Sequence, residues 1–201
     1  MILWACLNAL WSFGESFSQE AAIAEISEAA ATITTMQCDF VQTKSLKMLG
    51  DKLVSKGLMA CTFPDKLRWE YLTPYTYTFV LNNNQVHVKK GRRSDLIDVN
   101  QNKMFKGITR IMMNSVLGKC LTDKDDFHAT VVSQGDTYLA TLLPQKKEMK
   151  QMFSKIVLRY DRKMAMVITV ELHERNGDNT VIELTNIRKN EKVNAARYQV
   201  D

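Results

Sequence analysis

The stretch FPDKLRWEYLTPYTYTFVLNNNQVHV, residues 63–88, places large apolar side chains on alternate residues, with mostly polar groups between them. This period of two is the pattern of a β-strand with one buried face. Turn-forming residues interrupt the pattern at 64–65 (Pro-Asp), 73–74 (Thr-Pro) and 82–84 (Asn-Asn-Asn). Because connections this short require antiparallel neighbours, the stretch predicts consecutive strands of a meander.

The rest of the chain follows the same pattern, with two helical interruptions. Apolar residues recur every three or four positions over residues 20–36 and 101–119, and the cationic residues 144–151 predict a loop or short helix. A sheet of about ten strands curls or closes. We therefore predict a mainly β fold with α-helices, in which a strongly curved antiparallel sheet forms an incomplete β-barrel and helices plug its open side. Strands are expected at residues 38–49, 53–63, 66–72, 76–81, 85–89, 95–99, 127–133, 137–143, 154–160, 164–174, 180–187 and 198–200.

Length and composition indicate one folded domain. The chain has 201 residues, of which 45% are hydrophobic, too many for a disordered chain. A net charge of +5 raises the possibility of a nucleic-acid or anionic membrane partner. Because lysines and arginines are interleaved with acidic residues along the whole chain, a solubilising surface is favoured and no nucleic-acid partner is expected.

Residues 1–18 are expected to be a signal peptide. Residues 2–10 are mostly apolar, and residues 16–18 (Ser-Phe-Ser) resemble a small-x-small cleavage site, although no lysine or arginine precedes the apolar run. The run is too short to span a bilayer. Residues 19–201 are then a single exported, soluble domain.

The cysteines and histidines give no sign of a metal site or of catalysis. Cys38, Cys61 and Cys120 remain in the expected domain without a CxxC spacing. A turn near residues 49–51 would bring Cys38 close to Cys61, as a disulfide or as separate buried thiols. The three histidines, His87, His128 and His173, lie far apart, and no HExxH, GxSxG or phosphate-binding glycine loop occurs. We expect no catalytic residue, no metal, no cofactor and no enzymatic activity.

The alternating aromatic residues are the strongest functional signal. Such rows usually fill a core, but a single curved sheet of this length encloses more space than two small helices readily fill. Small barrels fill such space with a ligand. The methionine-rich helix at 101–119 is either a core helix or a lid. The expected cavity residues are Phe40, Leu58, Leu67, Trp69, Tyr71, Tyr77, Phe79 and Leu81, and the expected lid residues are Met104, Phe105, Ile108, Ile111 and Met112.

At these residues the chain resembles the LolA family of periplasmic outer-membrane lipoprotein carriers. The most specific match is the motif Pro-x-x-apolar-Arg-Trp-x-Tyr at residues 64–71, followed by Pro74. The similarity extends over about residues 20–200. The supporting matches are Phe40 and Gln42 on the first strand, Gly57 on the second, Leu143, Pro144 and Lys146, and Asn186 with Ile187.

The resemblance implies a periplasmic, monomeric carrier whose cavity, under lid helices, receives the acyl chains of lipoproteins and shuttles them from inner to outer membrane. The implied partners are acylated lipoproteins, an inner-membrane lipoprotein-releasing ABC complex as donor, and an outer-membrane acceptor. The alternatives are a carrier or sensor of another lipid on the same fold, and a lipid hydrolase with a nucleophile and a base at the cavity mouth.

The chain departs from the family pattern at two places. Typical members carry an arginine directly before the motif proline, where it holds the lid closed, and here that position is Phe63. Arg68 is a candidate replacement, although alternation places it opposite Trp69, facing outwards. The chain also ends soon after Tyr198, so we expect the longer C-terminal extension of the family to be missing.

Overall fold

The computed structural model describes residues 17–99 and 103–199, with the backbone alone for residues 103–108. Strands make up most of the described chain. They are β1 (Thr35–Ser45), β2 (Lys52–Thr62), β3 (Lys66–Thr73), β4 (Tyr77–Asn82), β5 (Gln85–Lys90), β6 (Arg93–Asp98), β7 (Phe127–Gln134), β8 (Thr137–Pro144), β9 (Phe153–Asp161), β10 (Met166–Glu174) and β11 (Asn179–Lys189). The helices are α1 (Gln19–Ala31), α2 (Lys103–Val116) and α3 (Lys147–Met152), with short 3₁₀ turns η2 (Lys119–Leu121) and η3 (Ala195–Tyr198).

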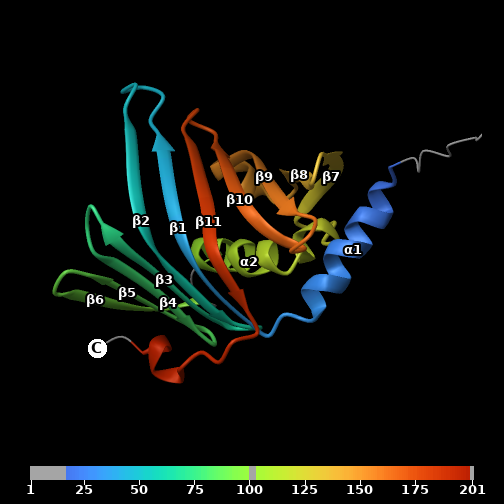
Figure 1. Ribbon diagram of the computed structural model, residues 1–201. Coiled ribbons are helices and arrows are strands. Elements are labelled where there is room, and N and C mark those ends of the chain that lie inside the picture. The colour runs from blue at the N-terminus through green and yellow to red at the C-terminus, as the bar shows by residue number, and fades with distance from the viewer. Residues whose placement is uncertain (1–16, 100–102, 200–201) are drawn as a thin grey trace, which may run out of the picture.

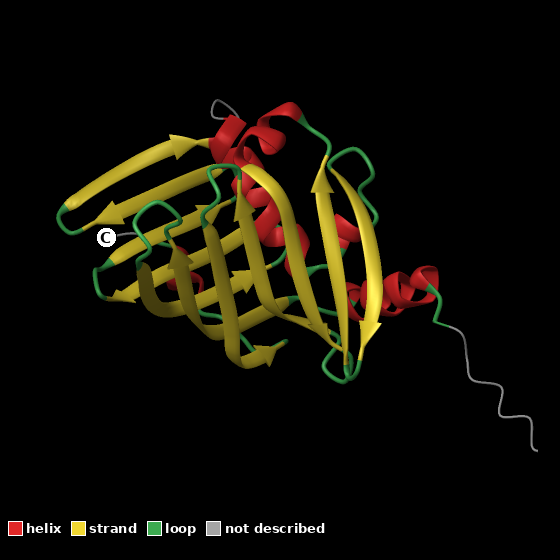
Figure 2. Cartoon of the chain, turned by 90° about the horizontal axis from the view of Figure 1, so that it is seen from above, coloured by secondary structure: helices red, strands yellow, loops and turns green. Residues whose placement is uncertain are grey.

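The eleven strands form one antiparallel sheet in the order β6-β5-β4-β3-β2-β1-β11-β10-β9-β8-β7. The chain builds the sheet outwards from β1 to the edge strand β6 and then inwards from the other edge, β7, to β11, which pairs with β1. The segment between the two edges contains α2, which lies within the curve of the sheet (Figures 1 and 2). The predicted fold class, a curved sheet forming an incomplete barrel with helices on its open side, is confirmed.

Several predicted boundaries are wrong. The first helix ends at Ala31, where the Thr32 N–H donates to the Ala29 carbonyl and the Ile33 N–H donates to the Ala30 carbonyl. Met36 is a buried residue of β1. A strand was expected at 198–200, but Tyr198 belongs to the 3₁₀ turn η3, which the Asn194 side chain caps by accepting from the Ala196 N–H. Residues 200–201 lie outside the described part.

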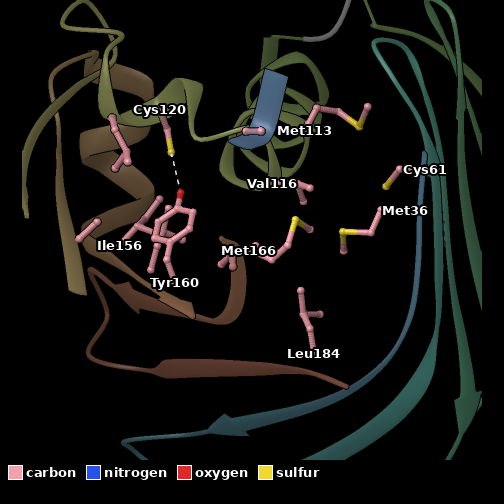
Figure 3. Close-up of a cluster of buried hydrophobic side chains, with 14 of the residues drawn as sticks. Met36, Cys61, Met113, Val116, Cys120, Ile156, Tyr160, Met166 and Leu184 are labelled. Carbon is pink, nitrogen blue, oxygen red and sulfur yellow. Dashed lines mark hydrogen bonds between the residues drawn. The ribbon is translucent and has the colours of Figure 1, made fainter. Parts of the chain in front are cut away.

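The concave face holds the main apolar core, to which β-strands and α2 both contribute (Figure 3). Met36, Met166 and Leu184 from the strands and Val116 from α2 point into the same interior (Figure 3). Tyr160 is fully buried, and its hydroxyl donates to the Ser115 carbonyl oxygen over 2.9 Å, which ties the C-terminal end of α2 to β9.

Helix α1 lies against the end of the sheet that includes the edge strand β7. It begins at Ser18, whose hydroxyl accepts from the Ala21 N–H at 3.2 Å, and buries Ala22, Ile26 and Ala30. Gln19 Oε1 accepts from the Val131 N–H of β7 at 2.9 Å. The predicted signal peptide falls almost entirely in residues 1–16, outside the described part, and stays a prediction. Within that part, no helix is both long and apolar enough to cross a membrane.

Gly57 leaves space for the ring of Phe40 to pack against Trp69. It lies opposite Phe40 in the β1–β2 pair, and a Cβ at this position would overlap the Glu70 carbonyl oxygen and come within 2.6 Å of Phe40 Cε1. The Phe40 ring therefore lies over β2, with its centroid 4.3 Å from that of Trp69. This contact explains the glycine on the second strand in physical terms.

We expect Gly57→Ala to lower the free energy of unfolding by about 3 kcal/mol, because the added methyl group overpacks a site with no free space. Urea denaturation would measure the loss. The matched control is Gly50→Ala, where nothing lies within 4 Å and only the positive φ of +68° is penalised, at about 1 kcal/mol. Equal losses in the two variants would contradict this account of Gly57.

The structure decides between a disulfide and separate buried thiols. Cys38, Cys61 and Cys120 are all free and buried. Cys61 pairs with Met36, and Cys38 pairs with Met59, so the two thiols lie on diagonal positions of neighbouring strands. Burial raises the pKa of Cys38 and of Cys120 to about 12, and it raises that of Cys61 further. These thiols are held protonated and unreactive at neutral pH.

Iodoacetamide at pH 8 should therefore alkylate these three cysteines at least about 100-fold more slowly in the folded protein than in urea, since thiolate is the reacting form. Peptide mapping by mass spectrometry gives the rate at each residue. Labelling in urea without a reductant is the control for the free state. If Cys38 and Cys61 stayed unlabelled there and became labelled only after reduction, the two would form a disulfide and the free-thiol assignment would be wrong.

Candidate functional site

A cavity of about 280 Å³ lies between α2 and the concave face of the sheet. Its wall is made almost entirely of apolar side chains, and it draws on both halves of the sheet. The lining residues are Gln42, Met59, Trp69, Tyr71, Tyr77, Phe79, Ile111, Met112, Ser115, Val116, Phe153, Val167, Val170, Leu172, Ile182 and Leu184.

Strands β3 and β4 form an aromatic wall. Trp69 pairs with Phe79 and Tyr71 pairs with Tyr77 in the antiparallel register, so alternation brings all four rings to one face. The centroids of Tyr71 and Tyr77 are 5.8 Å apart in an edge-to-face arrangement. Phe40 of β1 packs beside this wall, since its ring is edge-on to Tyr71 with the centroids 5.2 Å apart. Rings locked against each other in this way form the rigid side of the cavity.

The opposite side is mainly aliphatic. Helix α2 contributes Ile111, Met112 and Val116, together with Ser115, and β10 and β11 contribute their inner residues. Phe153 of β9 adds one aromatic ring. Val116 and Leu184 are drawn in Figure 3, where both lie among the side chains that converge from α2 and the strands. Flexible, unbranched methionine next to branched aliphatic side chains gives a surface that can adapt to the shape of a ligand.

Polar groups on the wall are few. The Tyr71 hydroxyl donates to Gln42 Oε1 over 2.9 Å. Burial raises the pKa of Tyr71 to about 12, and the nearby Trp69 N–H partly opposes this rise without meeting the geometry of a hydrogen bond. Tyr71 is therefore neutral at physiological pH. No charged side chain lines the cavity in the described part of the chain, so a ligand would be bound by apolar area and shape.

The structure places most of the predicted site residues near this cavity. Of the expected lining, Trp69, Tyr71, Tyr77 and Phe79 are on its wall, as are the lid residues Ile111 and Met112. Phe40, Leu67 and Leu81 are buried in the adjoining core and do not line it. The side chains of Met104, Phe105 and Ile108 lie outside the described part.

The prediction for Leu58 is wrong, because β2 presents Met59 to the cavity and turns Leu58 to the other face. Leu58 lies opposite Asp39 and Glu70, whereas Met59 lies opposite Trp69. Sequence analysis also missed the contributions of Phe153, β10 and β11. Apolar alternation in residues 164–174 and 180–187 was a usable signal, but only the pairing of β11 with β1 shows that these strands face the aromatic wall.

Ion pairs attach α2 to the loop before β7. The Arg110 guanidinium contacts the Asp126 carboxylate and lies 4.0 Å from that of Asp123. Asp126, whose side chain is only 6% exposed, is also 2.6 Å from Lys146 Nζ. A nearly buried carboxylate between two cations thus ties the helix to the loop before β7 through residues that do not line the cavity.

The two candidate latch positions, Phe63 and Arg68, have other roles. Phe63 is partly buried against the core. Arg68 faces outwards, as alternation predicts, and its Nε is 2.9 Å from Glu70 Oε2. Its Nη1 also donates to the carbonyl oxygens of Arg197 and Gln199 at 3.3 and 3.4 Å, so Arg68 holds the C-terminal segment on the outer face.

Across residues 17–99 and 103–199, no group of three or more His, Cys, Asp or Glu side chains is arranged to hold an ion.

Solved structures share the fold at low sequence identity. A chain of the Pseudomonas aeruginosa MucA/MucB complex superimposes with a TM-score of 0.53 at 11% identity, over 91% of this chain and 61% of that one. An uncharacterized conserved protein from Thermus thermophilus gives 0.54 at 9% identity, over 92% and 95%. A DUF1329 family protein from Desulfovibrio piger gives 0.50 at 12% identity, over 92% and 98%. Such low identities show a common fold and nothing more.

Comparison with curated proteins finds no match. The sequence profile of the family described as outer membrane lipoprotein carrier protein LolA, however, matches residues 31–201. The matched region begins at the end of α1 and includes every strand of the sheet and the whole cavity lining. The chain therefore belongs to the outer membrane lipoprotein carrier protein LolA family.

Proposed function

We propose that this protein is a periplasmic carrier that binds the acyl chains of lipoproteins in the cavity under α2 and shuttles them from the inner to the outer membrane. The observation that carries the proposal is the cavity itself, an apolar, uncharged space under a helix in a chain of the LolA family. An inner-membrane lipoprotein-releasing ABC complex would be the donor and an outer-membrane protein the acceptor. The carrier would act as a monomer.

The cavity volume sets how much of an acyl chain fits in the closed form. A dry cavity of about 150 Å³ holds one benzene molecule, so 280 Å³ admits only part of a long chain. Each further methylene group removed from water would contribute about 0.8 kcal/mol. That gain is available only if α2 moves away from the aromatic wall and widens the space. Loading and unloading would then be coupled to the position of α2.

A substitution in the lining tests the cavity as the binding site. Met112→Asp places a carboxylate on an apolar wall, where its desolvation opposes acyl binding, and we expect copurifying lipid to fall at least about tenfold. Native mass spectrometry of protein purified from the periplasm without detergent measures the bound lipid. Met48→Asp is the matched control, because Met48 is 93% exposed on the β1–β2 hairpin. Undiminished lipid in folded Met112→Asp protein would count against this cavity as the binding site.

A substitution of Arg110 tests the attachment of α2. Arg110→Gln removes one of the two cations at Asp126, and losing one charge-assisted contact of about 1.5 kcal/mol should speed opening of α2 roughly tenfold. Hydrogen exchange of the α2 amides measures the opening.

Arg93→Gln is the control for this experiment, because Arg93 forms an exposed ion pair with Asp95 on the edge strand β6. It should leave the exchange of α2 unchanged. Unchanged α2 exchange in Arg110→Gln would show that the ion pairs do not hold the helix.

A carrier or sensor of another lipid on the same fold is the second candidate. An uncharged cavity selects acyl chains without selecting a head group, and Phe63 stands where typical carriers have their latching arginine. A chain from the MucA/MucB complex has the same fold, so a protein partner is compatible with this architecture. Identifying the copurified lipid separates the candidates, since a phospholipid or free fatty acid in place of acylated peptide would favour the second. The hydrolase alternative gains no support from the described lining, which includes no histidine.

A further inference from the structure

Two polar atoms on the cavity wall have no hydrogen-bond partner in the described part of the chain. They are Nε1 of Trp69 and Oγ of Ser115, in side chains that are 7% and 3% exposed. Trp69 belongs to the aromatic wall on β3, and Ser115 belongs to α2. Both residues line the same cavity.

Leaving such atoms unpaired is costly, and the rest of this region avoids it. A buried polar group without a partner costs about 1–3 kcal/mol. The Tyr71 hydroxyl has Gln42 as its partner, and the Tyr160 hydroxyl has the Ser115 carbonyl. A phenylalanine at position 69 would keep the stacking on Phe40 without burying an N–H. The fold therefore satisfies its other buried hydroxyls nearby and leaves these two atoms on the cavity wall.

The neighbouring groups leave both atoms without a well-formed bond. The Trp69 N–H is near the Tyr71 hydroxyl but does not reach it in hydrogen-bond geometry. The Ser115 hydroxyl is near the Cys120 thiol, and sulfur is only a weak acceptor. The indole N–H can only donate, so whatever satisfies Trp69 must carry a lone pair. An aliphatic chain alone cannot do so, whereas the carbonyl oxygen of an acyl ester or amide can.

We infer that the cavity includes a subsite for the carbonyl group of an acyl ester or amide, with the Trp69 N–H as donor and the Ser115 hydroxyl as a second donor from α2. The inference rests on the proposed function and narrows it, because it distinguishes acyl esters and amides from hydrocarbon of equal length. It also predicts where the ligand lies in the cavity. The carbonyl group would lie between β3 and α2, and the acyl chain would extend from it along the aliphatic lining.

Methyl laurate and n-tridecane are matched probes, having the same number of carbons with and without the ester. Each would be delivered from cyclodextrin to the full chain, and binding measured by native mass spectrometry. We expect Trp69→Phe to lower the affinity for methyl laurate relative to that for tridecane about three- to tenfold. Ser115→Ala should act in the same direction, and Ser115→Thr should restore binding. Ser94→Ala, on the exposed edge strand β6, should have no effect.

Infrared spectroscopy of ¹³C-carbonyl methyl laurate gives an independent readout. The bound ester should show a carbonyl stretch shifted to lower frequency than in alkane solvent, and Trp69→Phe should remove part of that shift. Equal weakening of both probes, or an unshifted carbonyl band, would overturn the subsite while leaving a lipid-binding cavity in place. Failure of the unaltered protein to bind either probe would overturn the proposed function together with the subsite.

Discussion

The apolar concave face of a sheet that does not close has to be covered, and the rest of this structure depends on how that is achieved. Eleven antiparallel strands curl but leave β6 and β7 as separate edges, with no second sheet among the described residues to pack against. The chain must pass from one edge to the other, and the segment that does so contains α2. Helix α2 is therefore both the connection and the cover of the cavity. It does not fill the whole space beneath it, and the space left over is the cavity.

The distribution of polar contacts fits a cover that moves. Across the cavity, α2 meets the sheet through aliphatic and aromatic side chains, which gain by contact area and have no fixed geometry to break. Two of its directional contacts are made with residues outside the cavity lining, since Arg110 contacts Asp126 and the Ser115 carbonyl accepts from Tyr160. Ligand entering between α2 and β3 would replace apolar contacts with similar ones, whereas opening of α2 would break the contact between Arg110 and Asp126.

Alternation in the sequence was enough to predict the curved antiparallel sheet and the aromatic wall, because Trp69 lies between Arg68 and Glu70, neither of which could take the inward position. It failed at β2, where Leu58 and Met59 are both apolar and only the pairing with Trp69 decides between them. The aliphatic side of the cavity was also beyond sequence reasoning. It depends on the pairing of β1 with β11, a contact between residues about 150 positions apart that no local pattern encodes.

The alternation of side chains along β3 also explains why Arg68 does not hold α2. Trp69 points inwards, so its neighbours Arg68 and Glu70 must point outwards. There they pair with each other, and Arg68 also binds the carbonyls of Arg197 and Gln199 in the C-terminal segment. An arginine on the convex face cannot reach a helix on the concave face unless the pairing of β3 shifts by one residue. That shift would turn the aromatic wall out to solvent. Phe63 is uncharged, so neither of these two positions holds α2 by charge. Among the described residues, the helix itself supplies a cation, Arg110, which contacts Asp126 in the loop before β7.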